Sequence, residues 1–81
     1  MSPTRPHELA DPNRQEGTIV RRVEGRGFGF IRNPVTNEEF FFHATELENC
    51  EFPNLRDGDR VSFLGLASPK GPRAEQIRKL E

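Results

Sequence analysis

Short runs of alternating hydrophobic and polar residues, separated by turn-forming residues, make up most of this 81-residue chain. β-branched and aromatic side chains are frequent in these runs and favour extended backbone. The runs are Gly17 to Val23, Gly27 to Arg32, Glu39 to His43, Arg60 to Leu66 and Arg73 to Arg78. Gly, Pro, Asn and Asp punctuate the connections between them, as in all-β proteins. Five such strands predict a small antiparallel Greek-key barrel.

The first sixteen residues differ in composition from the rest. Pro3, Pro6 and Pro12 interrupt them, they hold almost no apolar side chains, and they show no periodicity. A segment with so little apolar surface to bury does not fold by itself. We therefore expect a flexible N-terminal tail over residues 1 to 16 and one folded domain over residues 17 to 81. Within the domain, one helical turn is expected at Thr45 to Leu47, followed by a long acidic loop.

Aromatic side chains concentrate in the second and third strands, and their spacing predicts where each one points. Successive side chains of a strand face opposite ways, so residues two apart share a face. The outward set predicted by this rule is Phe28, Phe30, Phe41 and His43. The inward set is Ile31, Phe40 and Phe42, joined by Val61 and Phe63 of the fourth strand and Ile77 of the fifth. The two sets predict a core on one side of these strands and an exposed row of rings on the other.

Exposed rings are unusual on a small domain, because large apolar patches on a surface usually meet a partner. Bases of single-stranded nucleic acid stack on aromatic rings with little sequence preference, and arginines beside the rings suit the phosphates. Two alternative roles remain open for Phe28, Phe30 and Phe41: a dimer interface, or a second packing layer.

Charge is distributed unevenly, although the net charge is only -1. Residues 17 to 32 carry four arginines against one glutamate, and residues 60 to 81 carry five cations against two glutamates. Residues 33 to 59 carry seven carboxylates and one arginine. A polarised surface of this kind attracts a polyanion despite the acidic sum.

The composition also limits the kinds of chemistry that the chain can perform. With two histidines, one cysteine and carboxylates mostly in one loop, no catalytic constellation or metal cluster can be assembled, so we expect no enzyme, cofactor or metal. Cys50 alone excludes an internal disulfide and fits a reducing compartment. No apolar run reaches the roughly 20 residues that span a bilayer. We expect a soluble, cytoplasmic monomer without membrane contact.

From Gly17 to about Leu80 the chain resembles a cold-shock domain, a five-stranded OB-fold barrel. Arg26 to Ile31 is similar to that family's first ribonucleoprotein motif, and Phe40 to His43 to its second. Lys70 to Ala74 resembles the family's Gly-Pro turn before the fifth strand, and Phe52 falls at a family-like spacing. The resemblance implies binding of single-stranded RNA or DNA, in the role of an RNA chaperone or a regulator of transcription or translation.

The expected nucleic-acid-binding residues combine the outward rings, the neighbouring charges and the positions that match family motifs. They are Arg21, Arg22, Arg26, Phe28, Phe30, Arg32, Glu39, Phe41, His43, Phe52, Lys70 and Arg73. No catalytic or metal-ligating residue is expected.

The first strand departs from the family pattern. Where family members typically have Lys-Trp-Phe-Asn, this chain has Val20 to Val23, and Ala44 replaces a frequent aromatic. The resemblance places Arg21 where a tryptophan stacks a base, a task that a guanidinium plane can share. Arg21 and Arg22 cannot both enter a core, which predicts a twist or bulge here. The departures leave open a second function, that of a protein-interaction adaptor.

Overall fold

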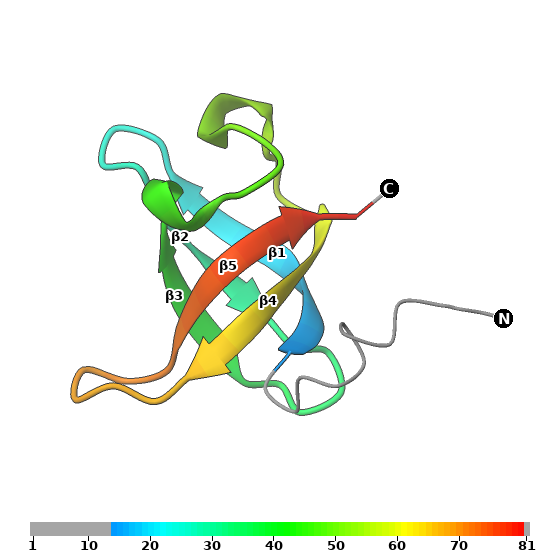
Figure 1. Cartoon of the computed structure of the whole chain (residues 1–81), viewed down its shortest axis with the longest axis vertical. Helices are drawn as coiled ribbons and strands as arrows, with labels where there is room; N and C mark the ends of the chain where they lie inside the picture. The colour runs from blue at the N-terminus through cyan, green and yellow to red at the C-terminus, as the bar shows by residue number, and fades with distance from the viewer. Residues whose placement is uncertain (1–13, 81) are drawn as a thin grey trace, which may run out of the picture.

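The five strands close into a barrel around the inward-facing side chains. The computed structural model describes residues 14 to 80. Its strands are β1 (Arg14–Val23), β2 (Phe28–Arg32), β3 (Glu39–His43), β4 (Arg60–Leu66) and β5 (Arg73–Lys79), hydrogen-bonded in the order β1-β2-β3-β5-β4. In Figure 1 the red β5 accordingly lies between the green β3 and the yellow β4. The predicted five-stranded barrel is confirmed. Its pairings are antiparallel except that β3 and β5 meet in parallel, through the single pair Phe41 and Arg73.

β1 begins earlier than the sequence pattern indicates. Arg14 to Glu16 pair with β4, and the Gln15 side-chain oxygen accepts a hydrogen bond of 2.8 Å from the Asn33 amide. The predicted start of the first strand, Gly17, is therefore three residues late. Backbone pairing, and not a hydrophobic pattern, holds these polar residues in the strand. Residues 1 to 13 of the predicted tail lie outside the described residues.

A bulge in β1 sets the direction of its arginines, as predicted. Ile19 pairs with Ile31, but the next pair is Arg21 with Phe30, so Val20 is the extra residue. Strict alternation would point Arg21 the same way as Ile19, into the core. The extra residue shifts the phase instead. Ile19 is consequently buried, and Arg21 is exposed beside Phe30.

The core contains the side chains predicted to face inward, all of them almost completely buried. It comprises Ile19, Ile31, Phe40, Phe42, Leu55, Val61, Phe63, Ala74 and Ile77. The rings of Phe40 and Phe63 pack edge to face with centroids 5.0 Å apart. Two 3-10 turns, η1 (Ala44–Glu46) and η2 (Phe52–Asn54), lie in the connection between β3 and β4. The helical turn expected at residues 45 to 47 is η1, one residue earlier.

Gly29 lets the core approach the backbone of β2 closely. A Cβ atom at this position would lie 2.5 Å from the Arg21 carbonyl oxygen and 2.8 Å from the Phe42 ring. Because neither neighbour can withdraw without moving β1 or the core, we expect Gly29→Ala to lower the free energy of unfolding by about 1 to 3 kcal/mol. Urea denaturation measures this loss. Gly25→Ala is the matched control, since a Cβ at Gly25 meets nothing within 4 Å. Equal stability of the two variants would contradict the packing described here.

Candidate functional site

Three phenylalanine rings meet on the outer face of β2 and β3, and we call them the aromatic platform (Phe28, Phe30 and Phe41). The ring centroids of Phe28 and Phe41 are 5.4 Å apart, those of Phe30 and Phe41 6.0 Å, and those of Phe28 and Phe30 6.1 Å. Phe41 is 42% exposed, whereas its neighbours Phe40 and Phe42 are buried. The alternation along β3 thus produces the predicted faces, and the platform presents a continuous apolar surface to solvent.

The register of the strands arranges the outer side chains in rows across the barrel, because residues directly opposite each other share a face. The first row comprises Val23, Phe28 and His43; the second Arg21, Phe30, Phe41 and Arg73; the third Thr18, Arg32 and Glu39. In the second row, therefore, two phenylalanines lie between two arginines from β1 and β5. The platform is bordered by cations on both sides.

His43 lies at the edge of the platform and is oriented by the turn that follows β3. The backbone N–H of Thr45 donates to its Nδ1 atom over 3.2 Å, so that His43 caps η1. In the neutral ring the proton then lies on Nε2, which can donate to a ligand. Thr45 was not among the predicted site residues. Because a backbone N–H makes this contact, the threonine side chain gave no signal for it in the sequence.

The cations around the platform differ in how far they are already neutralised. Arg32 forms an ion pair of 3.1 Å with Glu39, and Arg73 forms one of 2.6 Å with Glu75. The other predicted cations around the platform, Arg21, Arg26 and Lys70, have no ion pair with another residue in the range 14 to 80. Lys70 and Arg73 line a hollow of about 260 Å³ beside Phe41 and His43. Arg26 is exposed in the turn before β2.

Arg22 and Phe52 form a separate group. Arg22 pairs with Gly29 across β1 and β2, so it does not share the face of Arg21. Its guanidinium carbon lies 5.8 Å from the centroid of the Phe52 ring, and it forms ion pairs with Glu24 (3.1 Å) and Asp57 (3.5 Å). Its side chain is only 17% exposed. The structure thus brings these two predicted site residues together, but not into the three rows of the platform.

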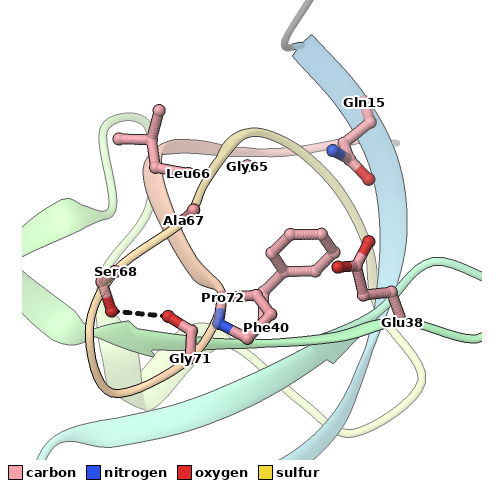
Figure 2. Close-up of a pocket in the computed structure, with 9 residues that line it drawn as sticks. All are labelled: Gln15, Glu38, Phe40, Gly65, Leu66, Ala67, Ser68, Gly71 and Pro72. Carbon is pink, nitrogen blue, oxygen red and sulfur yellow. Dashed lines mark hydrogen bonds between the residues drawn. The ribbon is translucent and has the colours of Figure 1, made fainter.

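A pocket elsewhere on the barrel differs from the aromatic platform in the side chains that line it. Figure 2 shows it between the β4–β5 turn and the first residues of β1 and β3, with the Phe40 ring as one wall. Gln15 and Glu38 also line it, and the Ser68 hydroxyl donates to the Gly71 carbonyl. Among the described residues that line this pocket, none is a cation. It therefore does not extend the basic and aromatic surface.

Residues 14 to 80 also contain side chains of the types that bind metals or act as nucleophiles. In that range no three His, Cys, Asp or Glu side chains gather in a way that could hold a metal ion. Cys50 packs against the core, and desolvation by burial raises the pKa of its thiol. The thiol is therefore less ionised at neutral pH than a free cysteine, which makes it a poor nucleophile. The same range contains no helix with the length and apolar character needed to cross a membrane.

The chain is similar in sequence to known proteins. Residues 15 to 80 match the family model of the "'Cold-shock' DNA-binding domain". Cold shock protein CapB of Pseudomonas syringae is 35% identical over 66 residues, which cover 82% of this chain and 94% of that protein. The cold shock-like protein of Aquifex aeolicus is 36% identical over 79% of this chain and 91% of its own length.

A solved structure has the same architecture. The structure of Drosophila Unr CSD456 matches 93% of this chain with a TM-score of 0.68 and 26% identity, and the match spans 30% of that longer chain. These similarities in sequence and fold agree with the two motifs, Arg26 to Ile31 and Phe40 to His43. The chain therefore belongs to the cold-shock domain family, whose members bind nucleic acid and are not enzymes.

Proposed function

We propose that this protein binds single-stranded RNA or DNA by stacking bases on the aromatic platform, and that it acts as an RNA chaperone or as a regulator of transcription or translation. The observation that carries the proposal is the second row, in which Phe30 and Phe41 lie between Arg21 and Arg73. Rings stack bases, and flanking guanidinium groups contact phosphates or stack on bases themselves. Both kinds of contact meet on one face.

The platform favours unpaired strands over duplexes. A base stacked on an aromatic side chain gains roughly 1 to 3 kcal/mol, and only an unpaired base can lie flat on an exposed ring. Bases that open transiently in a weak duplex are then captured, which shifts the equilibrium toward the unpaired form by mass action. No ATP is required for this activity.

The proposed binding residues are those predicted from the sequence. Phe28, Phe30, Phe41 and His43 would stack bases, and the surrounding cations Arg21, Arg26, Arg32, Lys70 and Arg73 would contact phosphates or base edges. Glu39, in the third row, would accept hydrogen bonds from a base. Arg22 and Phe52 would extend the surface at its margin, where the Phe52 ring is already covered by Arg22.

The setting that we propose is a monomer in the cytoplasm. A single half-buried cysteine requires no oxidising compartment, and its partial burial limits access to the thiol of a second copy. A monomer leaves the platform free for nucleic acid, whereas a dimer built on these rings would cover it.

NMR titration with a mixed-sequence single strand of eight nucleotides tests this function. The expected result is a set of chemical-shift changes at Phe28, Phe30, Phe41 and His43, and binding at least tenfold tighter than that of a duplex of the same length, because paired bases cannot stack on the rings. The duplex controls for charge, because it carries about twice as many phosphates and would bind more tightly if charge alone set the affinity. Changes confined to residues 46 to 59, with none at the platform, would contradict stacking on the platform. No change at any residue would support a protein-interaction adaptor instead.

A further inference from the structure

A hollow of about 330 Å³ lies at one end of the aromatic platform, where the second and third rows meet. It is lined by Val20, Arg21, Phe30, Arg32 and Glu39. Its lining thus includes a ring that can stack a base, two guanidinium groups and a carboxylate. A carboxylate repels phosphate, so its presence on this surface points to a partner group that donates hydrogen bonds.

The Glu39 carboxylate has capacity to accept such bonds. Arg32 Nη2 contacts only its Oε2 atom, at 3.1 Å, and Oε1 accepts no hydrogen bond from another residue in the range 14 to 80. The Glu39 side chain is 47% exposed. An ionised carboxylate has about four lone-pair sites and can accept two parallel hydrogen bonds. The contact with Arg32 holds the group in place and leaves most of that capacity open.

The edges of the four bases match a carboxylate unequally. Guanine carries two adjacent donors, N1–H and the N2 amino group, which fit the two oxygens of one carboxylate. Adenine and cytosine pair one amino donor with a ring nitrogen that accepts, and uracil or thymine places one donor between two carbonyl oxygens. On the adjoining Hoogsteen edge, guanine O6 and N7 are the acceptors that arginine contacts most often. Guanine is thus the base that satisfies both a carboxylate and a guanidinium.

We infer that this hollow is a guanine-selective subsite, an inference that rests on the proposed binding of single strands. The guanine stacks on Phe30, its N1–H and N2 amino group donate to Glu39, and Arg21 donates to O6 and N7. The direction of the base follows from the strand order, since β1 with Arg21 and β3 with Glu39 lie on opposite sides of β2 with Phe30.

Fluorescence titration with four DNA strands tests the inference. The strands are heptathymidylate and three heptamers in which guanine, adenine or cytosine replaces the central thymine. We expect the guanine strand to bind about 5- to 10-fold tighter than the other three, the low end of what a bidentate contact provides, because the hollow is open to solvent. Inosine in place of guanine lacks the N2 amino group and should lose most of this gain. 7-Deazaguanine lacks N7 but keeps O6, so it should lose only the hydrogen bond that Arg21 donates to N7.

Glu39→Gln tests the carboxylate itself. The amide offers one acceptor and one donor, so the ratio of guanine-strand to heptathymidylate affinity should fall toward 1. Glu38→Gln is the matched control, since it removes the same charge from the adjacent residue, which lines the pocket of Figure 2 and not this hollow. The general gain from losing a negative charge cancels in the ratio. Circular dichroism confirms that both variants are folded.

The outcomes separate the two proposals. If none of the four strands binds, the proposed function fails. If all four bind the wild-type protein with equal affinity, or if Glu39→Gln keeps the guanine preference of the Glu38→Gln control, the guanine subsite is wrong and the single-strand binding function stands. A preference for adenine, cytosine or thymine would overturn the subsite in the same way.

Discussion

Replacing Phe42 by alanine is expected to lower the free energy of unfolding by about 3 to 5 kcal/mol. Phe42 is 1% exposed, its ring lies against the backbone at Gly29, and its centroid is 6.3 Å from that of Phe52. Removing the ring leaves a cavity that these neighbours cannot fill. A domain of this size has a small free energy of unfolding, so this substitution should remove most of it. Urea denaturation followed by circular dichroism measures the change.

Phe41→Ala is the matched control, one residue away with the same chemistry. Because Phe41 faces outward and is 42% exposed, its removal should change stability by less than about 1 kcal/mol. Its loss should instead weaken binding of a single strand by about 1 to 3 kcal/mol. Equal destabilisation by the two substitutions would show that the assignment of faces in β3 is wrong.

Affinity for a single strand is expected to fall steeply with salt. If three to five of the cations around the platform contact phosphate, the slope of log K against log salt concentration should be about -2 to -3.5, at roughly -0.7 for each neutralised phosphate. A tenfold rise in salt then weakens binding by about 100- to 3,000-fold. Titrations of one labelled strand at four or more salt concentrations give the slope.

Arg21→Ala should make that slope less negative by about 0.7 if Arg21 contacts a phosphate. Arg56→Ala serves as its control, because Arg56 is also exposed but lies in the acidic connection before β4, outside the three rows. A slope near zero for the wild-type protein would mean that the arginines take no part in binding, and would leave stacking as the whole interaction.

Periodicity predicted the strands well where a hydrophobic run and a turn signal coincide. The bounds of β3 and β4 agree with the prediction, and so do the faces of the rings in β2 and β3. The start of β1 could not be predicted in this way. Gln15 and Glu16 show no pattern, and their place in the strand depends on pairing with β4, more than forty residues later in the chain.

The candidate site was predictable in its rings and less so in its charges. Side chains two residues apart in a strand share a face, which is a local rule. That Arg73 lies beside Phe41 depends on the closure of the barrel between β3 and β5, and that Arg32 pairs with Glu39 depends on register. The direction of Arg22 depends on the bulge at Val20 and on a loop that carries Phe52. The bulge could be expected from the two adjacent arginines, but the partners of these side chains are set by non-local contacts that alternation along one strand does not predict.

The close contact between Phe42 and the backbone at Gly29 has a consequence for protein engineering. One layer of backbone separates the interior from the rings of Phe28 and Phe30, so a designer cannot add a side chain at Gly29, between them, without straining the core. Arg21 and Arg73 project from strands on either side of that contact. Specificity is therefore best redesigned from the flanks, where side chains can be exchanged while the barrel keeps its packing.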